Sequence, residues 1–274
     1  MTTSFTKDDI EILIATMNQS SLDFLIPMFS DSALLEIPIL IVNQTNKTNL
    51  LASDNPKISV INSFEKGLSK SRNLAMQNAK GKILLIADDD VVYHKNMITT
   101  ILDAYNAHSN AASIVFCATN LEGKTFKKYP KQTKPNLNRL DIYNVMSIEM
   151  TLNKAIIATN SIIFDEDFGL GSPYTMGEEA VFLNDLKNKK QQIVFVPKNI
   201  VSHPEETTNH KISIEQKYHL IGALYSRNYK KACFLWIIIQ LFFDLKQSKI
   251  QWKQVVSLYK IAHFGRLHYL KHNK

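Results

Sequence analysis

An apolar run that ends in three consecutive carboxylates constrains this chain more than any other feature. The run covers residues 83–87 (ILLIA), and Asp88, Asp89 and Asp90 follow it directly. A short continuous apolar run is typical of a strand buried on both faces, as at the centre of a parallel sheet. In open α/β sheets the ligand crevice lies outside the carboxyl ends of the strands. The three carboxylates are therefore predicted to lie at the ligand-binding edge of a sheet.

Three adjacent carboxylates repel one another unless a cation compensates them. Hard divalent cations that prefer oxygen ligands, Mg²⁺ or Mn²⁺, suit such a cluster. A solvated acidic turn after a strand is the alternative explanation. The three residues alone do not distinguish the two.

Strand and helix patterns alternate along the first part of the chain. Strands are expected at residues 10–15, 37–42, 58–61 and 83–87, and helices at 22–29, 68–79 and 94–105. This alternation is typical of an α/β fold with a doubly wound, mostly parallel sheet flanked by helices. Further strands are expected at 112–118, 155–158, 161–164 and 193–196, a surface loop at 119–139 and a short helix at 178–186.

The charge of the chain is unevenly distributed. The net charge is +7, but residues 211–274 hold 12 Lys and Arg against two acids, which is +10 and leaves −3 for residues 1–210. We therefore expect an α/β domain over 1–210 and a basic, aromatic-rich helical extension over 211–274. Only Cys117 and Cys233 are present. Two distant cysteines argue against a disulfide scaffold and suit a reducing compartment.

The extension is predicted to form helices at 218–229, 232–245 and 252–270. Its longest apolar run has about a dozen residues, fewer than the roughly 20 that cross a bilayer. Its basic and aromatic residues fit attachment to a membrane surface, and packing on the first domain or a dimer contact is the alternative. Nucleic-acid binding is not expected, because the aromatics sit in apolar runs rather than as isolated stacking platforms. The polar N-terminus has no signal-peptide pattern, which favours a cytoplasmic protein, with the inner membrane face as a possible site of attachment.

Four stretches, taken in order, resemble the family 2 glycosyltransferases of the GT-A fold. They are residues 16–18 (TMN), then 71–75 (SRNLA) with 79–82 (AKGK) and 88–90 (DDD), then 160–169 (NSIIFDEDFG) with 177–179 (GEE), and finally His203. Each motif alone is weak, because any strand can end in acids. The order and spacing of the set carry the resemblance, over about residues 10–205.

The resemblance implies a nucleoside-diphosphate sugar as donor, held with Mn²⁺ or Mg²⁺. Asp88 and Asp90 look like the two acids of the family's Asp-x-Asp motif, and Asp89 lies between them. His203 is similar to the histidine that completes the metal shell in some members, so the implied metal ligands are Asp90, Asp88 and His203. Such a metal neutralises the diphosphate as it leaves.

The resemblance also implies which residues meet the nucleotide. Thr16, Met17, Asn43 and Arg72 sit where the family contacts the nucleoside, alongside Asp88 and Asp89. Family members commonly have Asp where this chain has Asn43, which puts the base in doubt. An Asn can accept a hydrogen bond from a uracil N–H, so UDP is the first expectation.

Glu178 and Glu179 fall where the family has Glu-Asp, whose second acid usually serves as base. The extra methylene of Glu179 lengthens its reach, so either glutamate could be the base. One base acting opposite the leaving group implies inversion at the anomeric carbon. The expected enzyme is a hexosyltransferase-like protein acting on a glycan or lipid-linked glycan acceptor, in bacterial surface polysaccharide synthesis.

Two other functions compete with this one. A sugar-nucleotide nucleotidyltransferase would need a Gly-rich, basic phosphate loop after the first strand, and residues 16–19 (TMNQ) do not supply it. A nucleotide-binding scaffold without turnover would not need the complete set of acids.

Overall fold

The computed structural model describes residues 4–29, 36–204 and 212–273. The chain divides into two compact units, one of Met1–Ser172 with Glu178–Glu205 and one of Pro173–Gly177 with Glu206–Lys274. The domain boundary expected at residues 210 and 211 lies outside the described residues.

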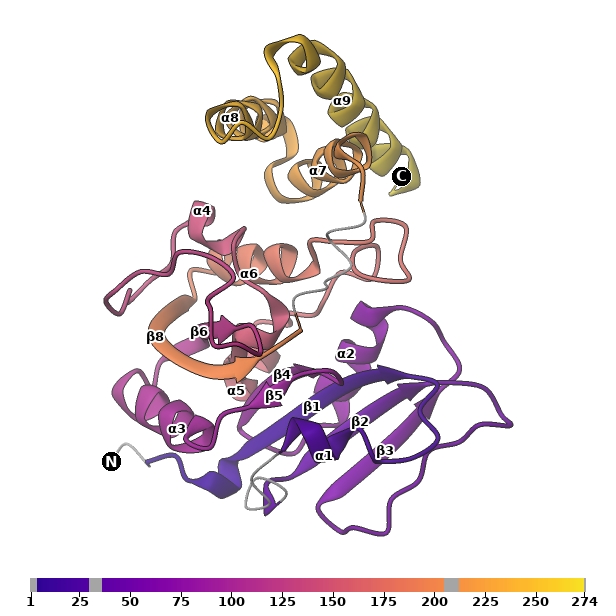
Figure 1. Ribbon diagram of the computed structural model, residues 1–274, viewed down its shortest axis with the longest axis vertical. Coiled ribbons are helices and arrows are strands. Elements are labelled where there is room, and N and C mark those ends of the chain that lie inside the picture. The colour runs from indigo at the N-terminus through magenta and orange to yellow at the C-terminus, as the bar shows by residue number, and fades with distance from the viewer. Residues whose placement is uncertain (1–3, 30–35, 205–211, 274) are drawn as a thin grey trace. The chain divides into compact units, whose positions relative to one another are not determined.

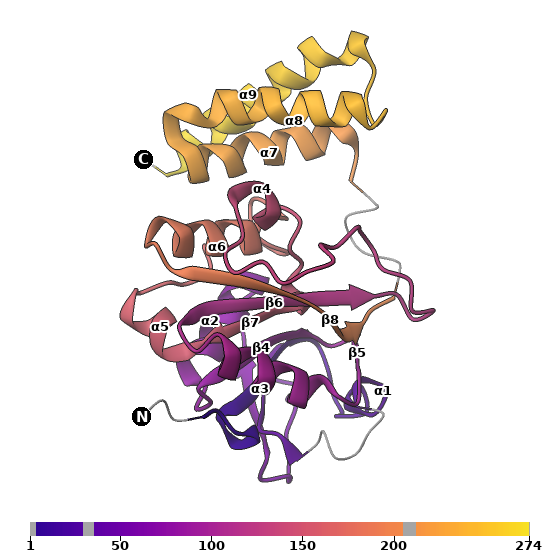
Figure 2. The ribbon, with the colours of Figure 1, turned by 90° about the vertical axis from the view of Figure 1, so that its left-hand side faces the viewer.

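The first unit is built on one mixed sheet (Figures 1 and 2). Within the described residues the sheet has eight strands in the order β3-β2-β1-β4-β7-β6-β8-β5. They are β1 (Ile10–Met17), β2 (Ile39–Gln44), β3 (Ile58–Ser63), β4 (Ile83–Asp88), β5 (Val92–Tyr93), β6 (Ala111–Thr119), β7 (Met150–Asn153) and β8 (Gln192–Ser202).

The four strands β3, β2, β1 and β4 run parallel, and their register aligns the expected site residues. Thr16 lies opposite Asn43, and Ala15 lies opposite Asp88. The carboxyl ends of β1, β2 and β4 therefore meet at one edge. Beyond β4, strand β7 runs antiparallel to both β4 and β6, so the sheet is mixed although its first half is wholly parallel.

Helices cover both faces of the sheet. They are α1 (Leu25–Met28), α2 (Leu68–Asn78), α3 (Met97–Ala107), α4 (Arg139–Ile142), α5 (Lys154–Thr159) and α6 (Glu178–Asn188). Met97 and Ile101 of α3 share a buried cluster with Ile12 and Ile14 of β1. Helix α2 lies against β1 and β2 but gives no side chain to this cluster, so it covers the other face. The predicted α/β class with flanking helices is confirmed.

Two of the expected strands are wrong. Residues 155–158 lie in helix α5, which begins after Asn153, whose side chain accepts a hydrogen bond from the Ile156 N–H. Residues 161–164 are not a strand either, and Ser161 has φ 53°. A short apolar run such as 155–158 (AIIA) is ambiguous between strand and buried helix. The strand of this region is β7 (Met150–Asn153), which the sequence pattern did not predict.

The second unit is a group of helices, α7 (Ile214–Tyr229), α8 (Cys233–Lys246) and α9 (Val255–His272). Helices α7 and α9 approach so closely that glycine is required at their contact. A Cβ on Gly222 would lie 1.8 Å from the Ala262 carbonyl oxygen, and one on Gly265 would lie 2.0 Å from that of His219. None of the described helices is both long and apolar enough to cross a membrane.

We expect Gly222→Ala to destabilise this unit, because the added methyl group would overlap backbone that a side-chain rotation cannot move. Overpacking of this kind costs about 1–3 kcal/mol. Thermal unfolding followed by circular dichroism should show the loss, and Gly265→Ala should show a similar one. Ser257→Ala, at an exposed position of α9, is the control. An unchanged melting temperature in both glycine variants would contradict the close contact.

Candidate functional site

The edge formed by the carboxyl ends of β1, β2 and β4 gathers most of the expected residues. The buried Thr16 donates a hydrogen bond to Asp89 Oδ2. Gln19 Nε2 donates to the same oxygen at 3.1 Å. Asp89 is thereby turned toward the end of β1. Gln19 was not predicted as a site residue, because nothing in the local sequence pattern indicates it. Met17, which was expected to contact the nucleotide, is exposed.

Asn43 lies at the same edge and is fully buried. Its Oδ1 accepts from the Gln19 N–H at 3.1 Å, and its Nδ2 donates to the Gln19 carbonyl oxygen at 3.0 Å. The same Nδ2 is 3.2 Å from Asn62 Oδ1. In this arrangement the amide of Asn43 holds the backbone that follows β1.

Arg72, on α2, is the centre of the charged part of the site. It is buried, with 3% of its side chain exposed. Nη2 donates to Asp88 Oδ1 at 3.0 Å, and Nη1 donates to Glu178 Oε1 at 3.1 Å and lies 3.9 Å from Glu179 Oε1. Burial disfavours its charge, but the three carboxylates outweigh burial and raise the pKa of Arg72. Arg72 thus joins the end of β4 to the start of α6.

Glu178 and Glu179 begin α6, where the helix dipole favours negative charge. Their surroundings differ. Glu178 is buried and hydrogen-bonded to Arg72, whereas 18% of the Glu179 side chain is exposed. Burial, and then the charge of Glu178, raise the pKa of Glu179 to about 8, although Arg72 opposes the shift. Glu179 is thus the more accessible carboxylate and has the pKa of a proton acceptor that works near neutrality.

Asp90 and His203 form a second group at this end of the sheet. His203 Nε2 is 3.2 Å from Asp90 Oδ1, and 54% of the Asp90 side chain is exposed. Their hydrogen bond lowers the pKa of Asp90 and raises the pKa of His203. His203 Nδ1 is 2.6 Å from the Pro204 carbonyl oxygen. Because a carbonyl only accepts, Nδ1 carries a proton, and the contact of Nε2 with the Asp90 carboxylate is a hydrogen bond only when the ring is protonated, which accords with the raised pKa of His203.

The three expected metal ligands are not brought together. Asp88 is bound by Arg72, and its second oxygen lies 3.4 Å from Ser147 Oγ. In the part of the chain that the structure describes, no three His, Cys, Asp or Glu side chains are arranged to hold a metal. Asp90 and His203 alone fit one as an open pair, since Mg²⁺ and Mn²⁺ keep waters and substrate phosphates among their ligands. Ser147 was not predicted, and no sequence signal marks it.

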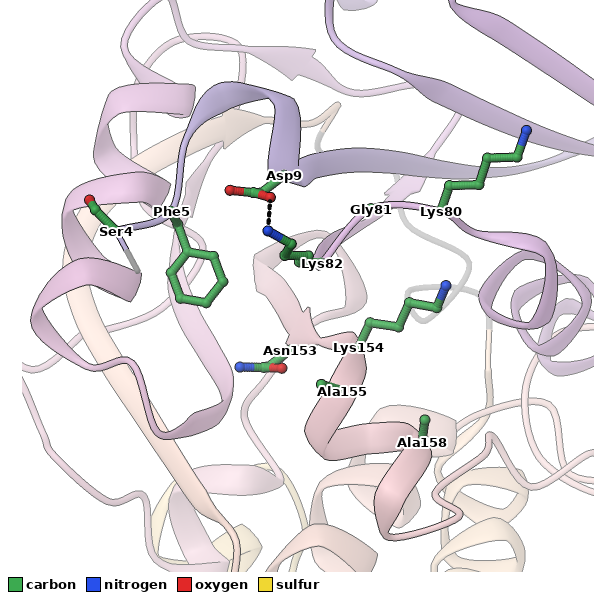
Figure 3. Close-up of a pocket in the computed structure, with 10 residues that line it drawn as sticks. All are labelled: Ser4, Phe5, Asp9, Lys80, Gly81, Lys82, Asn153, Lys154, Ala155 and Ala158. Atoms are coloured by element: carbon green, nitrogen blue, oxygen red, sulfur yellow. Dashed lines mark ion pairs between the residues drawn. The ribbon is translucent and has the colours of Figure 1, made fainter. Parts of the chain in front are cut away.

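A separate cavity of about 550 Å³ lies at the opposite end of the strands (Figure 3). Its lining includes Asp9 and Lys82, which precede β1 and β4. Lys82 Nζ pairs with Asp9 at 2.6 Å, and Lys154 Nζ donates to the Ala79 carbonyl oxygen. Two of its lysines therefore stabilise the fold, and the cavity belongs to the other edge of the sheet.

Comparison with known proteins agrees with this fold. Residues 35–168 match the family model described as glycosyl transferase family 2. No curated protein sequence matches the chain. Among solved structures, fragment 1–349 of S. aureus TarS matches with a TM-score of 0.54 at 17% identity, covering 80% of this chain and 64% of that one. The same fragment in complex with UDP-GlcNAc matches with a TM-score of 0.55 at 17% identity, covering 80% and 66%.

A second solved structure of S. aureus TarS, with a longer chain, also matches. Its TM-score is 0.54 at 18% identity, covering 79% of this chain and 39% of that one. The chain thus spans less than two thirds of the TarS chains it matches. At such low identity the likeness concerns the fold alone, and it agrees with the mixed sheet. Residues 35–168, just under half of the chain, are thus similar to glycosyl transferase family 2, and the solved structures show a shared fold.

Proposed function

We propose that this protein is a metal-dependent, inverting glycosyltransferase that uses a UDP-sugar donor. The observation that carries the proposal is the guanidinium of Arg72, which holds Asp88 from the end of β4 and the Glu178–Glu179 pair from the start of α6. These groups are far apart in the sequence, and the fold brings them together. Together they place a candidate base beside the strand end where a donor would bind.

Glu179 is proposed as the base. Its carboxylate accepts the proton of the acceptor hydroxyl as that oxygen attacks the anomeric carbon, and the bond from that carbon to the diphosphate oxygen breaks. Attack opposite the leaving group inverts the anomeric centre. Glu178 and Arg72 act through Glu179, because the first raises its pKa and the second holds its carboxylate near Asp88.

The donor end of the site is proposed to comprise Thr16, Met17, Asp88 and Asp89. Asn43 would act there through the backbone of Gln19, which it holds. UDP is favoured because TarS, which shares the fold, has been solved with UDP-GlcNAc and with UDP.

Asp90 and His203 would hold Mn²⁺ or Mg²⁺, whose charge stabilises the departing diphosphate. The exposed Asp90 carboxylate and the adjacent His203 Nε2, which would lose its proton on binding a metal, support this assignment. Asp88 would join them only if its bond to Arg72 were exchanged for the metal. An acceptor that is a glycan or a lipid-linked glycan, on the cytoplasmic side of a bacterial membrane, accords with the basic helical unit.

A donor screen tests the proposal. Purified protein is incubated with Mn²⁺ and a panel of UDP-, GDP- and dTDP-sugars, and released nucleoside diphosphate is measured with and without a mixture of glycan acceptors. We expect release from a UDP-sugar. Release from no sugar nucleotide, together with no binding of any of them, would refute the proposed donor class.

We expect Asp90→Asn to abolish transfer and to weaken Mn²⁺-dependent donor binding while leaving the fold intact, because 54% of the Asp90 side chain is exposed. Calorimetric titration of UDP with and without Mn²⁺ measures the binding. Asp103→Asn, at an exposed position of α3, is a control for loss of a carboxylate. Transfer at the wild-type rate in excess chelator would contradict the metal assignment.

A further inference from the structure

The turn between α8 and α9 exposes aromatic side chains among lysines. We call this group the α8–α9 tip. Its members are Phe242, Phe243, Lys246, Lys249, Trp252, Lys253 and Val256. Trp252 is 80% exposed, and Val256 and Phe242 are 65% and 60% exposed. Aromatic rings among lysines are the residue types that settle at the headgroup boundary of a bilayer.

Helix α8 has more apolar surface than its own core requires. One of its faces is buried, and a second apolar face, which leads toward the tip, is exposed. The buried face carries Cys233, Ile237 and Leu241, and the exposed face carries Leu235, Ile238 and Phe242. The second face is therefore available for something other than the folding of this unit.

The tip has a strong charge of one sign. After Glu215 the only Asp or Glu in the sequence is Asp244. Asp244 is 1% exposed and accepts hydrogen bonds from Tyr218 Oη at 3.0 Å and from Lys217 Nζ at 3.2 Å. Asp244 is thus turned inward, and Lys246, Lys249 and Lys253 are exposed, with no other carboxylate side chain in the described residues 216–273.

We propose that the α8–α9 tip binds the surface of a membrane rich in anionic phospholipids, with Trp252 and Phe242 at the headgroup level and the three lysines on the phosphates. A cationic patch attracts such a surface, and the attraction weakens with salt. A symmetric contact with a second copy would instead bring each lysine cluster against its own copy, which opposes association. The charge therefore favours lipid over a second copy.

Flotation of the full-length protein with vesicles tests this proposal. Vesicles of phosphatidylcholine with about one third phosphatidylglycerol should carry the protein upward at low salt, and pure phosphatidylcholine vesicles should not. The combined change Lys246→Gln, Lys249→Gln and Lys253→Gln should weaken binding on the order of 10²-fold. The same change at Lys57, Lys95 and Lys198, exposed lysines of the other unit, removes equal charge and should weaken it much less.

Fluorescence identifies the residue that enters the interface. The chain has two tryptophans, and Trp236 stacks on Tyr229 with ring centroids 4.3 Å apart. In a Trp236→Phe background the remaining emission comes from Trp252, and it should shift to shorter wavelength when anionic vesicles are added. Trp252→Ser should reduce flotation without lowering the melting temperature, because Trp252 lies outside the core.

Two outcomes would overturn the proposal. One is equal flotation of the two lysine variants, which would show that net charge and not the tip attracts the vesicles. The other is no flotation at low salt together with a dimer in sedimentation that Trp252→Ser dissociates, which would assign the tip to a second copy. The assay measures binding alone, so its failure leaves the proposed sugar transfer untouched.

Discussion

Arg72→Leu is expected to destabilise the first unit by about 3–5 kcal/mol, the usual cost of removing one partner from a buried ion pair. The guanidinium is 3% exposed and lies within 4 Å of Asp88, Glu178 and Glu179. Without it, three carboxylates that meet in a poorly solvated site lose their compensating charge. Donor turnover should be lost as well, because both the end of β4 and the start of α6 lose their common anchor.

The way in which the loss of stability changes with pH distinguishes loss of the Arg72 charge from simple loss of packing. Arg72 lowers the pKa of Glu179, and its removal would raise that pKa further above the unfolded value. Below about pH 8 this carboxyl is protonated in both folded proteins, which lose stability together, so the stability gap between variant and wild type should widen only as the pH rises above about 8 and stay constant in acid. Urea unfolding at several pH values measures this gap.

Lys70 provides a matched control on the same helix. It pairs with Glu65 at 2.7 Å, but 40% and 72% of the two side chains are exposed. Lys70→Leu should therefore change stability little, since exposed ion pairs contribute little. If Arg72→Leu proves as mild as Lys70→Leu at every pH, the buried cluster does not hold the site together.

Local patterns predicted the parts of the fold that depend on local sequence. The run before Asp88 is β4, the polar helix after Gly67 is α2, and the acids at Glu178 begin α6. The resemblance to family 2 rested on these segments, and the family match covers residues 35–168. The order of the strands around β7 could not be predicted in this way. A short apolar segment pairs with whichever strand edge the rest of the sheet leaves unpaired, and the local sequence does not show which edge that is.

Contacts between side chains that are far apart in the sequence could not be predicted from sequence patterns either. Arg72 and Glu178 are 106 positions apart, and no spacing rule joins a helix residue to an acid at such a separation. The sequence indicated Arg72 as a nucleoside contact, which stays a prediction, but it did not indicate that the guanidinium binds acids from two other segments. Likewise, the expected contact of Asn43 with a nucleoside stays a prediction, and its hydrogen bonds to the backbone of Gln19 were not foreseen.

Glu179→Gln is expected to retain donor binding and to lose turnover by about 10²-fold or more, the usual scale for removal of a general base. The amide has the same size and cannot accept the proton. Glu179→Asp keeps a carboxylate with a shorter reach and should lose less. If Glu178→Gln is inactive while Glu179→Gln is active, the two glutamates exchange roles, and if both variants turn over normally, neither is the base.

The pH profile supplies a second test, which a merely structural role would not pass. With a pKa of about 8 for Glu179, kcat/KM should rise about tenfold per pH unit below pH 8 and level off above it, because only the ionised carboxylate accepts a proton. Glu178→Gln removes the charge that helps to raise this pKa, so its profile should level off at a lower pH. A profile that stays the same in Glu178→Gln would mean that another group titrates, because Glu178 acts on the pKa of Glu179 through their proximity.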